Sequence, residues 1–330
     1  MKNKILALAL AAACAVSCYE DYVGNYSAVA CGFANQTDVR SLVVGEGMSF
    51  STGIALGGVI DNTEDRRIGF TTDYSLVGSA SYDAMKNHTF SYISKLMAGV
   101  PSISALPASL YEFGTEGRHP GQALIRKGSH LGVITVKVDS AAFLSDPGRL
   151  YPKEVIPLRI TDGGDTDVIS GKETTVIGVR YENMLFGNWY HGGVTEVRDA
   201  GGNLIRTDVY PATVPQAENL VWTLTTVEPF ALTANAYGSA FNGSKAQMKL
   251  SLNADDSITV ESVPGADVEI SADGESRFLR SKLLQDRKIV LSYSYVSDGN
   301  TCHARDTLSF RNRIRDGVNE WQDENPGNYE

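Results

Sequence analysis

The chain contains little cysteine and histidine, which are the usual protein ligands of zinc. Four cysteines and five histidines occur in 330 residues, and there is no C-x-x-C motif. The only close pair of a cysteine and a histidine is Cys302 and His303, which are adjacent. Neighbouring side chains on a strand point to opposite faces, so this pair would chelate a metal poorly. The sequence therefore suggests neither a structural zinc site nor a thioredoxin-like site.

The motifs of common enzyme classes are also missing. The chain has no H-E-x-x-H, G-x-S-x-G, P-loop or G-x-G-x-x-G motif. Ser129 and His130 are adjacent, but a serine–histidine dyad requires an oriented pairing in space that adjacency does not supply. We therefore predict that the protein is not an enzyme and uses no cofactor.

Runs of positive charge are absent as well. The formal net charge is −10, and no run of three or more consecutive lysine or arginine residues occurs. This composition argues against nucleic acid as a partner. It also argues against binding of the folded body to anionic lipid.

The N-terminus carries an export signal. A basic start precedes an apolar run from Ile5 to Ala13, which is shorter than the ~20 residues that a membrane-spanning helix needs. The segment Ala15 to Cys18 resembles the bacterial lipobox, in which the chain is cut before the cysteine and the thiol is diacylated. We expect residues 1–17 to be a signal peptide, Cys18 to carry the lipid and residues 18–26 to form a tether. Cys14 is a weaker alternative for lipidation, and an ordinary signal peptide is the other interpretation.

The residues after the lipobox indicate a location. Tyr19, Glu20 and Asp21 resemble the tag that sends lipoproteins to the outer face of the outer membrane in some Gram-negative anaerobes. A multi-chain lipid anchors a protein stably because each buried CH₂ contributes ~0.8 kcal/mol. We therefore expect an outer-membrane lipoprotein that faces the cell exterior. Loss of Lys2 and Lys4 with the signal peptide would give a mature net charge of −12.

The first half of the body consists mainly of short alternating or β-branched runs separated by turn residues. The expected strands are 42–44, 48–56, 67–72, 132–138, 155–160 and 174–181, with short helices within 82–97 and at 140–145. Leu131 to Val138 has apolar residues on both faces, which predicts a central strand covered on both sides. The strand spacing predicts a β-sandwich over residues 27–181.

The second half, residues 182–315, reads as a series of hairpins. The expected strand pairs are 187–197 with 204–210, 246–252 with 257–263, and 288–296 with 301–311. Successive hairpins predict an antiparallel up-and-down sheet, either an open meander or a small barrel. The fold class is therefore all-β. Residues 316–330 are polar, and we expect them to form a surface tail.

One acidic segment resembles a catalytic signature. Asp162 to Ile169 follows the D-G-x-D-x-D-x-E pattern of chitinase-like glycosidases, in which the final glutamate protonates the leaving oxygen. Here Ile169 stands at that position and has no proton to donate. The surrounding chain also lacks the alternating strands and helices of an eight-fold barrel. We interpret the segment as an acidic loop in which Asp162, Asp165 and Asp167 are a weak calcium candidate.

Aromatic side chains are the best candidates for ligand binding, because sugar faces stack on flat rings. Gly187 to Trp189 resembles the G-x-W opening of lipocalin-type barrels, which places Trp189 in the barrel floor. Tyr190 then points to the opposite side of the strand. Trp222 and Trp321 complete the set of candidates, although tryptophan is usually buried as core. Trp321 has polar neighbours, which favours exposure.

Cys31 and Cys302 remain after removal of the signal peptide. They stand near opposite ends of the mature chain, and the sequence leaves two interpretations open. One is a long-range disulfide, and the other is a pair of separate buried thiols.

Several segments together resemble a known domain pair. The motifs are Ala55 to Val59, Ile156 to Thr161 and Arg180 to Asn183 in the first half, and Asp306 to Gly317 in the second. The first set resembles the N-terminal immunoglobulin-like domain of surface lipoproteins from glycan-utilisation systems of the starch-utilisation type. This domain type also precedes catalytic domains in some chitinase-like endoglycosidases. The second set resembles the end of a lipocalin-like domain that often follows it.

The resemblance implies a non-catalytic protein of the cell surface that binds oligosaccharides or polysaccharides. It also implies a position near a partner transporter of the outer membrane. The alternative is an accessory subunit of a transporter or enzyme complex with no sugar affinity of its own. A glycosidase is the third and least favoured hypothesis, because Ile169 replaces the catalytic acid.

Overall fold

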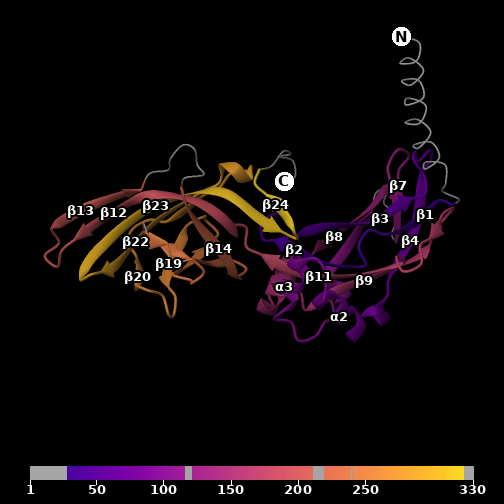
Figure 1. Ribbon diagram of the computed structural model, residues 1–330, viewed down its shortest axis with the longest axis horizontal. Coiled ribbons are helices and arrows are strands. Elements are labelled where there is room, and N and C mark those ends of the chain that lie inside the picture. Colours follow the sequence, from indigo (N-terminus) through magenta and orange to yellow (C-terminus); the bar gives the residue numbers. More distant parts are fainter. Residues whose placement is uncertain (1–27, 116–120, 211–218, 239, 242, 323–330) are drawn as a thin grey trace, which may run out of the picture.

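The structure is a computed structural model that describes residues 28–115, 121–210, 219–238, 240–241 and 243–322. Two β-domains lie end to end along the long axis of the molecule (Figure 1). The N-terminal domain is an immunoglobulin-like sandwich of two sheets, and the C-terminal domain is a closed antiparallel barrel. The predicted all-β fold class is confirmed.

The sandwich encloses a core of aliphatic and aromatic side chains from both sheets. The first sheet contains, in spatial order, β10 (Asp167–Val168), β1 (Ala30–Phe33), β3 (Ser49–Gly57), β8 (Leu131–Val138) and β6 (Tyr111–Thr115). The second sheet contains β2 (Thr37–Val43), β11 (Thr174–Glu182), β9 (Glu154–Asp162), β4 (Arg66–Thr72) and β7 (Gln122–Ile125), and β5 (Ser104–Ala105) pairs with β9. Residues therefore alternate between this core and the outer faces.

Short helices connect the strands of the sandwich. They are η1 (Tyr74–Leu76), α2 (Ser79–Lys86), α3 (Ser91–Met97), η2 (Ala108–Leu110), α4 (Ser140–Leu144) and η4 (Pro147–Leu150). Met85, Ile93 and Met97 of α2 and α3 pack on outward-facing residues of the second sheet and form a small second core. Helix α4 begins after Asp139, whose carboxylate accepts a hydrogen bond from the Ala142 N–H at 2.9 Å.

The prediction that β8 is covered on both sides was wrong. Ile134, Val136 and Val138 are buried in the sandwich, but Leu131 and Val133 are 45% and 38% exposed. The helices cover the second sheet only, so the outer face of β8 meets solvent. The presence of apolar residues on both faces of β8 did not show that both faces are buried, because isolated exposed apolar side chains are common on protein surfaces.

The barrel closes because β12 pairs with β14 on one side and with β23 on the other. Around the barrel the strands are β12 (Gly187–Arg198), β14 (Leu220–Glu228), β15 (Ala231–Ala234), β18 (Met248–Leu252), β19 (Ile258–Ser262), β20 (Ile270–Ala272), β22 (Lys288–Ser297) and β23 (Asn300–Arg315). The remaining elements are β13 (Leu204–Tyr210), β16 (Ala236–Tyr237), β17 (Ala240–Phe241), β21 (Arg277–Leu279), η6 (Leu284–Asp286) and β24 (Val318–Glu320).

The floor of the barrel is built around Trp189, as predicted. Its side chain is fully buried, its Nε1–H donates to the Leu185 carbonyl oxygen at 3.0 Å, and its ring meets the Phe310 ring edge to face at 5.4 Å. Val43, at the end of β2 in the sandwich, belongs to the same core as Trp189. The barrel floor therefore faces the sandwich, and the two domains share apolar packing.

The segment after Arg315 differs from the expected surface tail. Residues 316–320 turn back, and β24 pairs with the end of β23. The Asp316 carboxylate accepts a hydrogen bond from the Ser41 N–H of β2 at 3.1 Å, so the turn is attached to the sandwich. Residues 323–330 lie outside the described residues. None of the described helices is long and apolar enough to span a membrane.

Candidate functional site

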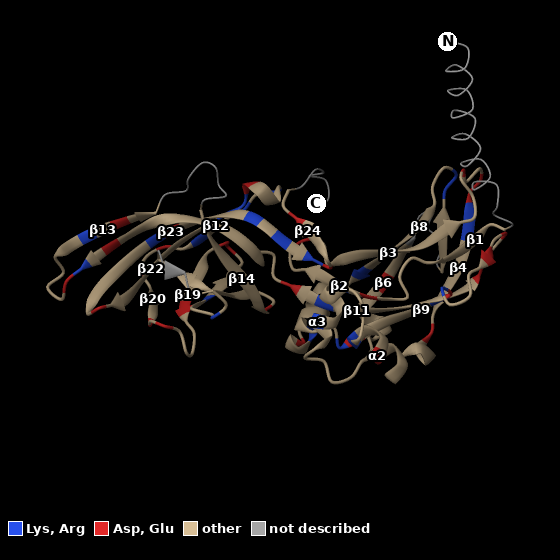
Figure 2. Cartoon of the chain, in the orientation of Figure 1, with Lys and Arg blue, Asp and Glu red and all other residues tan. Residues whose placement is uncertain are grey.

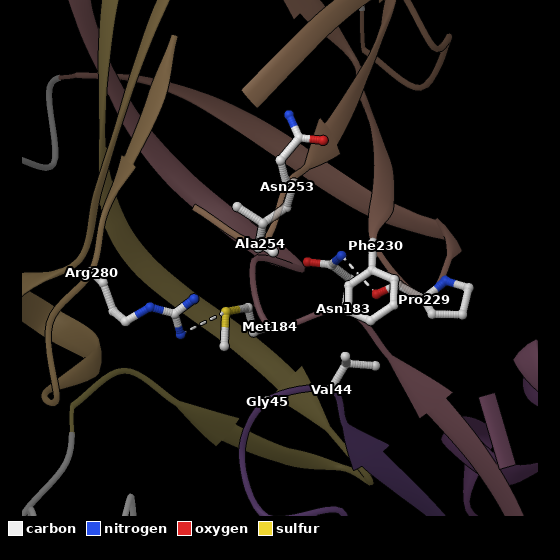
Figure 3. Close-up of a pocket in the computed structure, with 10 residues that line it drawn as sticks. Val44, Gly45, Asn183, Met184, Pro229, Phe230, Asn253, Ala254 and Arg280 are labelled. Atoms are coloured by element: carbon white, nitrogen blue, oxygen red, sulfur yellow. Dashed lines mark hydrogen bonds between the residues drawn. The ribbon is translucent and has the colours of Figure 1, made fainter. Parts of the chain in front are cut away.

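A cleft of about 380 Å³ lies at the junction of the two domains (Figure 3). It is formed by the β2–β3 loop of the sandwich, the linker after β11, and three loops of the barrel, namely the β14–β15 turn, the β18–β19 loop and the loop after β21. The side chains that matter most in it are those of Val44, Asn183, Met184, Phe230, Asn253 and Arg280. The wall is mostly apolar with a few polar groups, which is the usual composition of a small-molecule site.

Asn183 fixes the linker that forms the back of the cleft. Its side-chain amide donates to the Pro229 carbonyl oxygen at 2.9 Å, and its Oδ1 accepts from the Leu185 N–H at 2.9 Å. The Asn183 N–H donates to the Thr226 Oγ1 at 3.1 Å. Because these bonds reach the β14–β15 turn, the position of Met184 beside Asn183 is set by both the sandwich strand β11 and the barrel.

Phe230 supplies an exposed flat ring at the edge of the cleft. It lies in the turn between β14 and β15, and its side chain is 55% exposed. The Phe230 carbonyl oxygen accepts from the Leu252 N–H at 2.8 Å, which holds the turn against the start of the next loop. The Asn253 amide in that loop donates to Ser257 and Thr259, so it is directed away from the cleft.

Arg280 places a guanidinium group of fixed orientation at the other side of the cleft. Its Nη2 and Nε bond the two carboxylate oxygens of Asp256 at 2.6 and 3.1 Å. This bidentate pairing fixes the plane of the guanidinium. Among the described residues, the hydrogen-bond partner of its Nη1 is the thioether sulfur of Met184, a weak acceptor, at 3.4 Å. A ligand oxygen at this position would be a better acceptor than the sulfur.

A buried ion cluster lies beneath the cleft and joins the domains. Glu46 of the β2–β3 loop pairs with Arg287 at 2.7 Å and with Arg313 at 2.7 Å, and all three side chains are buried. Burial alone would raise the pKa of Glu46, but the hydrogen bonds and charges of Arg313 and Arg287 outweigh it and lower that pKa. The carboxylate is therefore ionised wherever the protein is folded near neutral pH.

Trp222 lies inside the barrel and does not face the cleft. Its ring is buried and stacks on the His191 ring at 4.4 Å, and the Tyr210 ring stacks on the other side of His191 at 4.9 Å. The Asp306 carboxylate accepts hydrogen bonds from the hydroxyls of Tyr210 and Tyr293, at 2.9 and 2.5 Å. These side chains fill the interior, which agrees with a core role for Trp222.

Tyr190 and Trp321 are accessible but lie outside the cleft. Tyr190 is half-buried on β12, on the opposite side of the strand from Trp189, and the Arg311 guanidinium lies 5.7 Å from its ring centre. Trp321 follows β24 and is 56% exposed, as its polar neighbours indicated. Neither residue is brought together with Phe230 or Arg280.

The three acidic residues of the loop after β9 do not form a metal site. Asp165 pairs with Arg66, and Asp162 accepts from the Gly164 N–H at 2.8 Å. Asp167 lies in β10, which pairs with β1. Within the described part of the chain, no group of three His, Cys, Asp or Glu residues is placed to hold a metal ion. The weak calcium candidate is therefore not supported, because each carboxylate has a separate structural environment.

The two remaining cysteines are separate thiols. Cys31 is buried in the sandwich core and Cys302 in the barrel core, and neither forms a disulfide. Burial raises the pKa of both thiols. The proposed lipid site, Cys18, lies outside the described residues.

The sequence patterns did not point to the residues that line the cleft. Phe230 gave a usable signal, since an aromatic residue directly after a proline in a short turn has little chance of entering the core. Met184 and Arg280 gave no signal in the sequence, because their roles depend on two loops that lie nearly 100 positions apart in the chain.

Comparisons with known proteins identify the fold. No family model matches this chain, and no curated protein matches it. A solved structure of a structural-genomics protein of unknown function from Bacteroides ovatus has a TM-score of 0.59 at 19% identity, covering 90% of this chain and 98% of that chain. A multidomain protein including DUF1735, also from Bacteroides ovatus, has a TM-score of 0.40 at 15% identity, covering 89% and 99%. The first likeness shows a shared fold and assigns no activity.

Proposed function

We propose that this protein is a non-catalytic glycan-binding lipoprotein of the outer membrane, directed to the cell exterior. Its role in this proposal is to hold oligosaccharides or polysaccharides close to a transporter of a polysaccharide-utilisation system. The observation that carries the proposal is the cleft between the domains, in which an exposed ring stands opposite a fixed guanidinium.

The chemistry of the cleft suits a sugar. The C–H face of a sugar ring packs on an exposed aromatic ring such as Phe230, and its hydroxyls accept hydrogen bonds from a fixed donor such as Arg280. Met184, whose side chain is largely buried, contributes an apolar part of the cleft lining. Asn183 holds the linker that carries Met184 and the turn that carries Phe230, and Asp256 holds Arg280. The cleft is therefore preorganised, and little conformational entropy is lost on binding.

The lipid anchor supports the same role. A surface-tethered binder meets a polymer at many points, so weak single sites add to a strong attachment. The anchor rests on the lipobox-like segment that ends at Cys18. Replacing Cys18→Ala should move the protein from the membrane fraction to the soluble fraction, and retention of the variant in membranes would contradict the anchor.

Affinity electrophoresis against a broad glycan panel tests the binding function. We expect at least one glycan to retard the purified full-length protein in detergent. Phe230→Ala should weaken that retardation by about tenfold or more, as expected for loss of an aromatic anchor.

Phe90→Ala is the matched control. Phe90 precedes α3 in the sandwich, lies outside the cleft and is 53% exposed, close to the 55% of Phe230. It should bind glycan like the wild type. If no glycan in the panel retards the protein, the proposal fails, and a stable complex in membrane extracts would then favour the accessory subunit.

A further inference from the structure

The cleft continues past Arg280 into a second, adjoining hollow of about 300 Å³. The two share Gly45, Met184 and Arg280, so they form one groove across the domain junction. The second hollow is lined by Lys282 and Arg287 in addition to Arg280. One end of the groove is therefore aromatic and the other is basic.

The basic end contrasts with the rest of the molecule. The chain has a net charge of −10, yet no described Asp or Glu lines either part of the groove. Figure 2 shows Lys and Arg along the end of β23 beside β24, where the two domains meet. Those β23 residues do not line the groove, whose own basic lining consists of Arg280, Lys282 and Arg287.

The arginines at the groove have carboxylate partners. Asp256 pairs with Arg280, and Glu46 pairs with Arg287. Behind them, Glu320 pairs with Arg315, and Asp316 adjoins the same arginine. The positive charge that the groove can offer to a ligand must therefore come from another residue.

Lys282 supplies this positive charge. It lies in the turn after Arg280, its side chain is exposed, and within the described part of the chain no carboxylate pairs with its ammonium. An ammonium on a flexible stem binds carboxylate or sulfate oxygens as a point charge. The Arg280 Nη1, whose hydrogen-bond partner among the described residues is the Met184 sulfur, stands between this charge and the aromatic end.

We propose that the groove binds an acidic glycan, one whose sugar ring packs on Phe230 while its carboxylate or sulfate group lies at Lys282 and Arg280. This inference rests on the proposed glycan-binding function and names the chemical class of its ligand. Neutral glycans would leave the positive charge at the basic end without a partner. Specificity would then follow from the charged group more than from the ring.

Matched probe pairs test the inference. Polygalacturonate and its methyl ester share a backbone and differ in carboxylate charge, and dextran sulfate and dextran differ in sulfate. We expect the full-length protein in detergent to be retarded by the acidic member of at least one pair and far less by its neutral partner. Lys282→Glu should weaken binding of the acidic member by about tenfold, which corresponds to ~1.4 kcal/mol.

Lys127→Glu is the charge-matched control. Lys127 is an exposed lysine of the β7–β8 turn in the sandwich, away from the groove, and the same charge reversal there should change binding less than twofold. Equal losses from the two variants would mean that charge attraction is general and would overturn the inference. Retardation by neutral glycans alone, sensitive to Phe230→Ala, would overturn the acidic ligand and leave the binding function standing. Retardation by no glycan would overturn both.

Discussion

At the scale of single residues, Glu46 links the two domains more directly than any apolar contact described above. Its carboxylate comes from the sandwich, while Arg287 and Arg313 come from the barrel. Removing the charge of one member of such a buried group leaves the opposite charges buried without a partner. The free energy lost in this way exceeds the net free energy that the intact ion pair contributes to stability.

Replacing Glu46→Gln should destabilise the protein by about 3–5 kcal/mol at neutral pH, because two buried guanidiniums would lose their shared carboxylate. The measurement is the free energy of unfolding in denaturant. Glu228→Gln is the control, since Glu228 pairs with Lys249 at the surface and is 56% exposed. Its loss should cost no more than about 1 kcal/mol. Equal effects of the two changes would contradict the role of Glu46.

The stability of wild type and that of Glu46→Gln should respond differently to acid. The pKa of Glu46 is lowered in the folded state, so its stabilising effect is complete above the ordinary carboxyl pKa of 4.5 and is lost as the pH falls through the lower folded value. The stability difference between wild type and Glu46→Gln should therefore narrow below about pH 4.5. A difference that stays constant down to pH 3 would contradict the ion-pair explanation.

At the scale of elements, the sequence predicted most of the long strands, because alternation of polar and apolar residues directly reflects burial on one face. Many short strands, such as β1, β7 and β15, were not predicted. Trp189 in the barrel floor followed from the G-x-W pattern, and β12 and β22 lie where the hairpin signals placed them. The short strand β24 was missed. Its sequence, Val318 to Glu320, is polar, and its position depends on pairing with β23 and on contacts to the sandwich.

The turn that precedes β24 makes a contact that can be tested. Gly317 has a φ of +81°, and a Cβ added there would lie 2.8 Å from the ring of Tyr92 in α3. Gly317→Ala should therefore lose stability through both backbone strain and a clash, by about 2–4 kcal/mol in total.

Gly299 provides a matched comparison for Gly317. It lies in the β22–β23 turn with a φ of +74°, and a Cβ there would have nothing within 4 Å. Gly299→Ala should cost only the backbone term, about 1 kcal/mol. Thermal unfolding of the two variants measures the difference. If they unfold at the same temperature, the turn at Gly317 does not pack on the sandwich as described.

At the scale of the whole molecule, the candidate site belongs to neither domain alone. Val44, Met184, Phe230 and Arg280 come from four segments, and only the joint placement of sandwich and barrel brings them together. Local patterns carry no information on such placement, which is why the sequence favoured Trp222 and Trp321 and overlooked Phe230. The fold was predictable from periodicity, whereas the site depends on how the domains dock.

Methionine methyl NMR of the full-length protein in detergent tests the location of the site most directly. Of the five methionines that the structure describes, only Met184 lines the cleft, while Met48, Met85, Met97 and Met248 lie elsewhere in the cores of the domains. A Met184→Leu variant assigns the signal. Titration with a glycan that retards the protein should shift the Met184 methyl resonance and leave the four core methyls in place. A saturating glycan that leaves Met184 unchanged, or shifts a core methyl instead, would contradict binding between the domains.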